Sequence, residues 1–166
     1  MFSPYTTLIS RVLKENPVTS TSDKTNIYKN LSVGFKSNGV PHTVLIIEDS
    51  LMAREMLRRI LLSMQFKIID EADNGEVALS KIKKSGLSPD FIFIDMEMPV
   101  MNGLETIKQI KPILPDSIII MVTSHGEKEL VTELATLGVQ GYIKKPYDRD
   151  TILIKLAAIL GRSVAY

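Results

Sequence analysis

FIFIDMEMPVMNG, residues 91–103, runs from four large apolar residues straight into the acid Asp95. The apolar residues do not alternate with polar ones, which is typical of a strand that is buried on both faces. The chain then turns at Pro99 and again at Asn102-Gly103, because these residue types favour turns. The stretch therefore predicts a buried strand that delivers a carboxylate to its own end.

A short apolar strand followed by a helix recurs five times from residue 43 onward. The strands are expected at TVLIIE (43–48), KIIDEA (67–72), FIFID (91–95), SIIIMVT (117–123) and QGYIKK (140–145). Strands of this kind form a parallel sheet between two helical layers, and right-handed crossovers make it doubly wound. We predict an α/β fold of the flavodoxin-like (βα)5 type, with a five-stranded parallel sheet in the order 2-1-3-4-5.

Local signals predict where two of the helices begin and end. A helix is expected to start at Asn74, and Gly86 can close it. Asn102 can cap the next helix, because Glu105 stands three positions later in a capping-box arrangement. Pro112 is expected to stop that helix.

The first 42 residues differ in composition from the rest of the chain. Residues 16–42 are rich in Ser, Thr, Asn, Lys and Gly without a sustained period, which indicates a linker or an irregular arm. Apolar spacing in front of them indicates a possible short helix over residues 4–14, although fortuitous spacing explains it equally well. We therefore expect an arm or linker over 1–42 and a folded domain over 43–166.

Composition narrows the classes of function. The 166 residues are 45% hydrophobic and 23% charged, as in ordinary globular proteins, and the formal net charge of +1 gives no reason to expect direct binding of nucleic acid. The absence of cysteine excludes disulfides and thiolate metal sites. No apolar run approaches the roughly 20 residues that span a bilayer, and the N-terminus lacks the features of a signal peptide. We expect a cytoplasmic protein without membrane insertion.

Reactive side chains follow the strands that are expected to meet at the switch point, where such sheets bind ligands. They are Glu48, Asp49, Asp95, Thr123 and Lys145. Three carboxylates repel one another unless a cation neutralises them, and a set of oxygen ligands favours Mg²⁺ or Mn²⁺. An incoming phosphate can complete such a site, which makes Asp95 a candidate nucleophile for an aspartyl phosphate. Thr123 and Lys145 are then placed to bind the phosphoryl oxygens.

Five motifs, in this order along the chain, resemble the receiver domain of bacterial two-component response regulators. The resemblance covers residues 43–162. Each motif is common alone, whereas the ordered set on successive strands is specific. The motifs are LIIEDS (45–50), ADNGEVAL (72–79), FIFIDMEMPVMNG (91–103), IIIMVTS (118–124) and GYIKKP (141–146).

The resemblance implies a metal and phosphoryl site. Asp95 is implied as the phosphoacceptor and Asp49 as a direct Mg²⁺ ligand, while Glu48 acts as the second acid through water. The backbone carbonyl of Glu97 is implied as a further metal ligand. Mg²⁺ is thus the expected cofactor.

The resemblance also implies a switch. Thr123 is implied as the switch hydroxyl and Tyr142 as the aromatic residue that changes rotamer with it. Lys145 is implied to pair with the phosphate and to precede Pro146 through a cis peptide bond.

The function that this implies is a phosphorylation-controlled response regulator in a two-component or phosphorelay pathway, and not an enzyme. A histidine kinase or a phosphotransfer protein is the expected donor. A downstream protein is expected to bind the face formed by the fourth helix, strand 140–145 and the last helix. No fused output domain is expected, in the manner of single-domain regulators of the chemotaxis type, and the arm over 1–42 makes a homodimer possible.

Two alternatives from other classes stay open at this point. One is a receiver-like binding module that is not phosphorylated, which the complete set of acids, threonine and lysine disfavours. The other is a phosphatase of the haloacid dehalogenase type, which also uses an aspartyl nucleophile. That class needs a second aspartate two residues after the nucleophile, where this chain has Glu97.

Two further hypotheses concern individual side chains. Glu97 and His125 are each two residues beyond a site residue, so they border the site and are candidates for a pair that controls the access of water. Met52 and Met56 are expected to face the core, as are Met64 and Met121. The remaining internal methionines lie in the loop after Asp95, where they are candidates for contact with a partner: Met96, Met98 and Met101.

Overall fold

The computed structural model describes residues 33–124 and 128–162. Its strands are β1 (Thr43–Ile47), β2 (Lys67–Ala72), β3 (Phe91–Asp95), β4 (Ile118–Thr123) and β5 (Gly141–Lys144). Its helices are α3 (Leu51–Ser63), α4 (Gly75–Ser85), α5 (Gly103–Ile110), α6 (Lys128–Thr136) and α7 (Arg149–Ile159). The possible helix over 4–14 lies outside the described residues.

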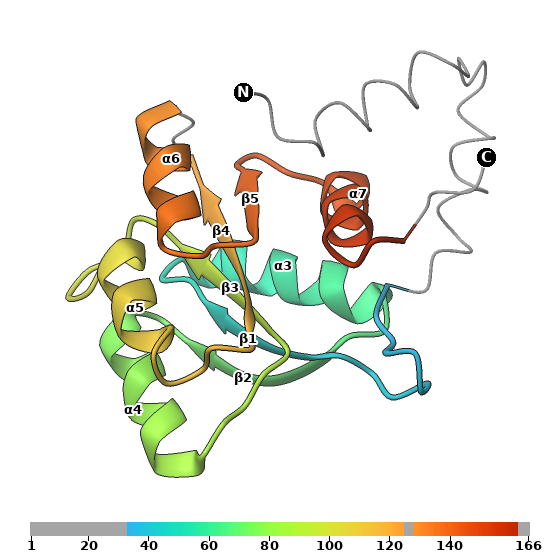
Figure 1. Cartoon of the computed structure of the whole chain (residues 1–166), viewed down its shortest axis with the longest axis horizontal. Coiled ribbons are helices and arrows are strands. Elements are labelled where there is room, and N and C mark those ends of the chain that lie inside the picture. Colours follow the sequence, from blue (N-terminus) through green and yellow to red (C-terminus); the bar gives the residue numbers. More distant parts are fainter. Residues whose placement is uncertain (1–32, 125–127, 163–166) are drawn as a thin grey trace.

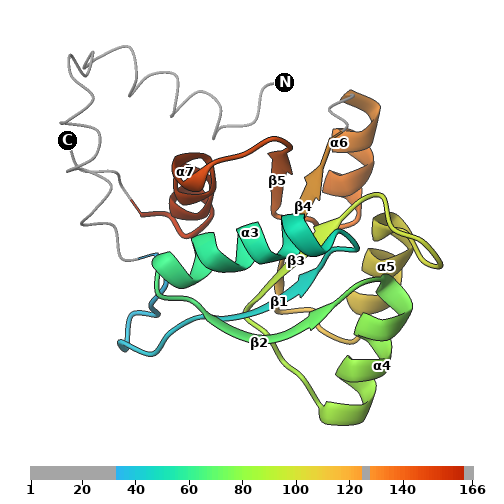
Figure 2. The same cartoon turned by 180° about the vertical axis from the view of Figure 1, so that it is seen from behind.

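The five strands form one parallel sheet in the order β2-β1-β3-β4-β5. Helices α3 and α7 cover one face of it, and α4, α5 and α6 cover the other (Figures 1 and 2). The predicted doubly wound fold and strand order are confirmed. None of the helices within the described ranges is long and apolar enough to cross a membrane.

Each central strand contributes side chains to both helical layers. In β1, Val44 and Ile46 pack in the core beneath α3 and α7, whereas Leu45 and Ile47 pack against α4 and α5. All four are fully buried. This explains why the strands read as unbroken apolar runs, since a polar residue on either face would be taken out of water.

The predicted helix ends are confirmed. Asn102 and Glu105 form a reciprocal capping box at the start of α5. Asn74 caps α4, which Gly86 closes with a left-handed backbone. These side chains satisfy backbone N–H groups that have no partner within the first turn of a helix. They also hold two helix N-termini at the edge of the sheet where the strands end.

The methionines of α3 depart in part from the expectation. Met52 is 84% exposed and Met56 is 42% exposed, so the prediction that both face the core is wrong. Met64 and Met121 are buried as expected. The buried face of α3 is formed by Leu57 and Leu61. Met52 and Met56 lie beside this face, and helical spacing alone does not distinguish the two positions from buried ones.

Residues 33–42 already pack onto the domain, ahead of the boundary expected at residue 43. Val33 is fully buried in the core, and a bridge between Phe35 and Pro41 closes a turn beside it. The backbone amide of Thr43 donates to Asp90 over 2.8 Å, and the ammonium of Lys36 lies 2.8 Å from the same carboxylate. The last ten residues of the predicted arm are therefore part of the domain in this structure.

An Asp90→Asn chain is expected to lose about 1–2 kcal/mol of unfolding free energy at neutral pH, because the carboxylate accepts charged and neutral hydrogen bonds. Burial opposes ionisation of Asp90, but the bonds from Lys36 and Thr43 outweigh it, and its pKa lies below the ordinary 3.8. A lowered carboxyl pKa stabilises the fold above the unfolded-state value, and this stabilisation is lost as the pH falls through the folded-state value.

Urea unfolding at pH 7 and at pH 3 measures this effect. The difference between Asp90→Asn and the natural chain should be present at pH 7 and shrink at pH 3. Equal stability of the two chains at pH 7 would show that the contacts of Asp90 do not hold the 33–42 segment.

Candidate functional site

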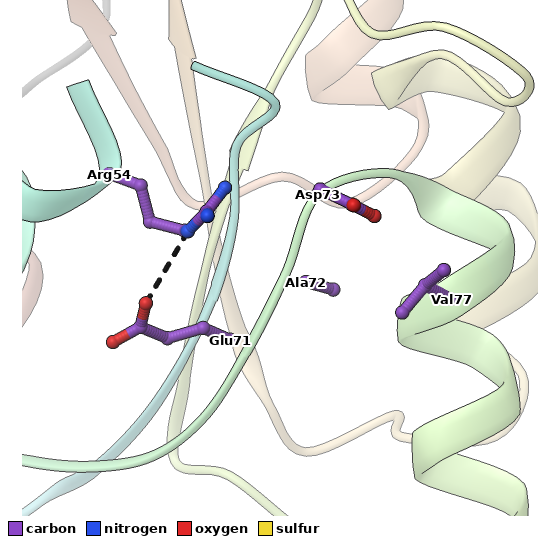
Figure 3. A pocket seen from close by; sticks show the side chains of 5 residues that line it. All are labelled: Arg54, Glu71, Ala72, Asp73 and Val77. Atoms are coloured by element: carbon purple, nitrogen blue, oxygen red, sulfur yellow. Dashed lines mark ion pairs between the residues drawn. The ribbon is translucent and has the colours of Figure 1, made fainter. Parts of the chain in front are cut away.

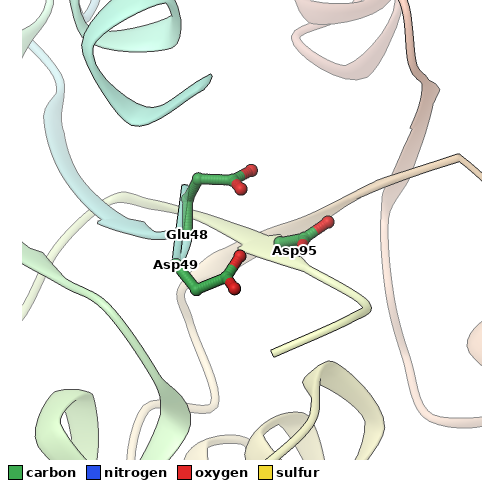
Figure 4. A group of neighbouring side chains, drawn as sticks. All are labelled: Glu48, Asp49 and Asp95. Carbon is green, nitrogen blue, oxygen red and sulfur yellow. The ribbon is translucent and has the colours of Figure 1, made fainter. Parts of the chain in front are cut away.

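Three carboxylates meet where β1 and β3 end. The two strands are neighbours, with Ile47 paired to Ile94, so Glu48 and Asp49 follow directly beside Asp95. One oxygen from each acid lies within 4.8 Å of the other two, and Figure 4 shows the three side chains gathered from the two strands. The parallel register thus brings the adjacent acids Glu48 and Asp49 together with Asp95, which is distant from them in the sequence.

Lys145 reaches this group from the end of β5, which is not adjacent to β1 in the sheet. Its Nζ lies 2.8 Å from Oε2 of Glu48 and 2.9 Å from Oδ1 of Asp95. The backbone amide of Lys145 donates to the carbonyl of Thr123 over 2.8 Å, which holds the lysine beside β4. The Lys145–Pro146 peptide is cis, as the resemblance implied.

The electrostatics of the site follow from burial and from an excess of acid. Glu48 is 2% exposed and Asp95 is 5% exposed. Burial raises the pKa of both carboxyls, and the hydrogen bonds from Lys145 offset part of this increase. Burial opposes the charge of Lys145 as well, but its bonds to both acids outweigh burial and raise its pKa. The lysine therefore keeps its proton, and its ammonium bridges Glu48 and Asp95 while the third acid, Asp49, lies beside them.

The donor set fits a hard divalent cation. The acid cluster of Glu48, Asp49 and Asp95 offers only carboxylate oxygens. Mg²⁺ prefers such ligands and usually keeps several bound waters. Asp49 is exposed, so an ion bound to it would be accessible to water. A cation would also reduce the mutual repulsion of the three acids, because one ammonium neutralises only part of their negative charge.

The two predicted switch residues lie on neighbouring strands, with Thr123 as the last residue of β4 and Tyr142 as the second residue of β5. Thr123 is fully buried and follows Val122, which is paired with Asp95. Tyr142 pairs in the sheet with Met121 and packs, partly buried, against the core beneath α4 and α5. The sheet therefore places the hydroxyl of Thr123 one residue beyond the level of Asp95.

The loop after β3 borders the site. Glu97 is exposed in this loop, and the predicted partner His125 lies outside the described residues. Met98 is buried, while Met96 and Met101 pack partly buried against the core. The three loop methionines thus contribute to packing and do not form an exposed patch.

Gly103 lets this loop return to the site. Its amide donates to the carbonyl of Met96 over 3.0 Å, and a Cβ on Gly103 would lie 2.4 Å from the backbone carbonyl oxygen of Asp95. No side chain fits without moving that backbone. This explains the turn residues that follow the acid in the sequence.

A Gly103→Ala chain is therefore expected to lose about 2 kcal/mol of stability, because the new methyl group forces the backbone of Asp95 to shift. The shift should also weaken binding of Mg²⁺ at the acid cluster. Urea unfolding and Mg²⁺ titration measure the two effects. Gly39→Ala is a matched control in which a Cβ meets nothing within 4 Å, although its positive φ adds some strain. Unchanged stability and Mg²⁺ binding in Gly103→Ala would contradict the packing argument.

Sequence reasoning missed Arg54 as a support of the acid pair. Its guanidinium donates to the backbone carbonyl of Glu48 over 2.6 Å and lies 3.4 Å from a carboxylate oxygen of Glu71. Figure 3 shows this ion pair at one side of a pocket of about 230 Å³ between α3 and α4, with Asp73 and Val77 opposite. The sequence shows that Arg54 follows Glu48 by six residues, but this spacing does not reveal that the arginine side chain folds back onto the carbonyl of Glu48.

A family model for the response regulator receiver domain matches residues 44–157 of this chain. The chain belongs to the response regulator receiver family. Receiver domains of this kind belong to two-component signalling and are signalling proteins, generally not enzymes. The match covers β1 to α7 almost completely, so the site described above lies wholly within the receiver domain.

Named relatives support the same assignment. The receiver chain is 30% identical over 141 residues to chemotaxis protein CheY of Treponema pallidum, covering 85% of this chain and 98% of that protein. It is 35% identical over 112 residues to CheY of Bacillus subtilis, covering 68% of this chain and 92% of that protein.

Solved structures agree. The CheX–CheY–BeF3–Mg²⁺ complex from Borrelia burgdorferi contains a chain that matches with a TM-score of 0.73 and 31% identity, covering 78% of this chain and 97% of that one. CheY4 of Vibrio cholerae matches with a TM-score of 0.64 and 29% identity over 71% of this chain and 98% of its own. The receiver is therefore similar in sequence and in fold to CheY proteins.

Proposed function

We propose that this receiver is a phosphorylation-controlled response regulator whose phosphoacceptor is Asp95. The observation that carries the proposal is the ammonium of Lys145 held 2.8 Å from Glu48 and 2.9 Å from Asp95, beside a third acid. Such a group has positive charge for phosphoryl oxygens, a carboxylate nucleophile and a ligand set for a cation in one place.

In the proposed reaction, a carboxylate oxygen of Asp95 attacks the phosphorus of a phosphohistidine. The new oxygen–phosphorus bond forms as the phosphorus–nitrogen bond breaks, and the imidazole nitrogen keeps the electron pair. The ammonium of Lys145 turns from the carboxylates to the phosphoryl oxygens. Asp49, Asp95, the carbonyl of Glu97 and, through water, Glu48 would hold Mg²⁺, which would neutralise negative charge at the site.

Signalling in this proposal follows from the new charge. A phosphoryl group adds roughly −1.5 to −2 charges at neutral pH. Thr123 moves toward it and donates a hydrogen bond, and Tyr142 takes up the space that becomes available. The two residues thereby change the relative populations of two states of the surface formed by α6, β5 and α7.

The partners in this proposal are proteins. A histidine kinase or a phosphotransfer protein donates the phosphoryl group, and a downstream protein reads the α6–β5–α7 surface. A relative from Borrelia burgdorferi is named as a complex with a second protein, BeF3 and Mg²⁺, which supports both the protein partner and the metal. The arm expected over residues 1–42 is a candidate for self-association.

Intact mass spectrometry after incubation with acetyl phosphate and Mg²⁺ tests the proposal. One added phosphoryl group on the natural chain is expected, and none on Asp95→Asn or in the presence of EDTA. Asp90→Asn is the matched control, because it removes an acid at the opposite end of β3 and should still be phosphorylated. An adduct that persists in Asp95→Asn would assign the acceptor to another residue.

The absence of an adduct on the natural chain calls for a second donor. A phosphorylated histidine kinase domain should then transfer its label to the natural chain and not to Asp95→Asn. No transfer from either kind of donor, with Mg²⁺ binding confirmed by titration, would contradict the proposed function.

A further inference from the structure

The three acids of the cluster are held in place unequally. Glu48 accepts hydrogen bonds from Lys145 and from the amide of Ser50, and Asp95 accepts one from Lys145. Within residues 33–124 and 128–162, no hydrogen bond or ion pair holds the exposed carboxylate of Asp49. The position of that carboxylate therefore depends on the backbone that carries it.

Arg54 fixes this backbone. Its Nη1 donates a hydrogen bond to the carbonyl oxygen of Glu48 over 2.6 Å. The charge of the guanidinium makes such a bond stronger than one between neutral groups. The carbonyl of Glu48 and the amide nitrogen of Asp49 belong to one planar peptide group. A bond that holds the oxygen therefore also holds the plane from which Asp49 projects.

The guanidinium of Arg54 is itself held at a second point. Its Nε lies 3.4 Å from the carboxylate of Glu71 on the edge strand β2, an ion pair that Figure 3 shows. The side chain of Arg54 is only 17% exposed. Its backbone amide donates to the carbonyl of Ser50 over 2.9 Å in the first turn of α3. Arg54 thus connects β2 and α3 to the peptide group between the two adjacent acids.

The direction of a carboxylate matters more to some cations than to others. Mg²⁺ is small and demands an almost ideal octahedral arrangement of oxygen ligands, whereas Ca²⁺ accepts flexible and irregular ones. A small displacement of one ligand therefore weakens the binding of Mg²⁺ more than that of Ca²⁺. Asp49 is the ligand for which such a displacement is easiest, because its side chain has no other support among the described residues.

We propose that Arg54 is a positioning residue of the metal site, which holds the Glu48–Asp49 peptide group and thereby directs the carboxylate of Asp49 so that the site favours Mg²⁺ over Ca²⁺. This inference rests on the proposed function, because it takes Asp49 to be a direct ligand of the metal. Arg54 acts through geometry, since its positive charge by itself opposes the binding of a cation.

Titration of the full chain with Mg²⁺ alone and with Ca²⁺ alone tests the inference. Arg54→Met should bind Mg²⁺ about tenfold more weakly than the natural chain, and Ca²⁺ within about threefold of it. Loss of a positive charge alone would strengthen the binding of both cations, so the expected weakening cannot come from charge. Binding of Mg²⁺ by Arg54→Met that equals or exceeds that of the natural chain would overturn the inference.

Arg58→Met is the matched control. It removes the same charge from the same helix and another ion pair of Glu71, over 3.0 Å, but no bond to the acid pair. This variant should bind Mg²⁺ at least as tightly as the natural chain. An equal loss of Mg²⁺ affinity in Arg54→Met and Arg58→Met would assign the effect to Glu71 or to the helix and overturn the inference.

NMR of the metal-free chains gives a readout that does not depend on the metal. The carbonyl carbon of Glu48 and the amide of Asp49 should both shift in Arg54→Met and stay in place in Arg58→Met. Unshifted signals in Arg54→Met would show that the bond does not fix this peptide group, against the inference.

Arg54→Lys keeps the test valid should the methionine variant fail to fold. It retains the charge without the planar fork of the guanidinium, so it should bind Mg²⁺ more weakly than the natural chain while its binding of Ca²⁺ changes less. Equal losses for the two cations would overturn the inference and leave the proposed function intact. Failure of the natural chain to bind Mg²⁺ would overturn the proposed function, and this inference with it.

Discussion

A Lys145→Met chain is expected to be about 2 kcal/mol less stable than the natural chain at neutral pH, and to lose its ability to hold a phosphoryl group on Asp95. The substitution keeps most of the side-chain volume and removes the ammonium that lies within 3 Å of Glu48 and Asp95. Removing one partner of a buried ionic group leaves the other charges uncompensated, which is more costly than the pair was favourable.

Mg²⁺ separates this electrostatic cause from a packing defect. In urea unfolding, saturating Mg²⁺ should stabilise Lys145→Met more than it stabilises the natural chain, because the cation replaces the missing positive charge. Lys145→Arg keeps the charge in a different shape and serves as the control, with a smaller loss of stability expected. Equal stability of Lys145→Met and the natural chain without Mg²⁺ would show that the ammonium does not neutralise the acids.

Asp95→Asn is expected to have the opposite effect on stability while abolishing phosphorylation. Burial raises the pKa of Asp95, so its ionised form is less favourable in the folded chain than in the unfolded one. For a carboxyl with a raised pKa, stability falls as the pH rises from the ordinary value of 3.8 toward the folded-state value. Asparagine has no such penalty, so the variant should be more stable by about 1 kcal/mol at neutral pH.

Urea unfolding over a range of pH measures this second prediction. The advantage of Asp95→Asn should be present at pH 7 and shrink as the pH falls below the ordinary value of 3.8, where Asp95 becomes protonated in the unfolded chain as well as in the folded one. A variant that is less stable than the natural chain at pH 7 would mean that the bond from Lys145 outweighs the burial of Asp95. The pKa of Asp95 would then lie below its ordinary value.

Together the two variants describe a site whose acidic groups lower the stability of the fold while they provide the groups for the proposed reaction. One ammonium bridges two of the three clustered carboxylates, an arrangement that a metal and a phosphoryl group would complete in the proposed function. Changing the acid should stabilise the fold and changing the lysine should destabilise it, although either change removes the function. Changes of opposite sign in the free energy of unfolding are expected where charged side chains are positioned for a reaction and not for stability.

The sequence by itself determined the sheet and the edge of the sheet at which the site lies. Apolar runs such as residues 91–95 are buried on both faces only in a parallel sheet, so composition and order led to the strand order that the structure confirms. The carboxyl ends of parallel strands lie at one edge. The acids at the ends of the first and third strands therefore lie close together at that edge, whatever their side-chain conformations.

Only the tertiary structure decided which side chains complete the site and which face water. The bond from Arg54 to Glu48, the burial of Tyr147 and the exposure of Met52 depend on how α3 and α7 lie on the sheet. The burial of Val33 depends on a core cluster whose other residues come from distant parts of the chain. Periodicity along one strand or helix fixes which residues share a face, but not what that face meets, because the packing partner comes from elsewhere in the chain.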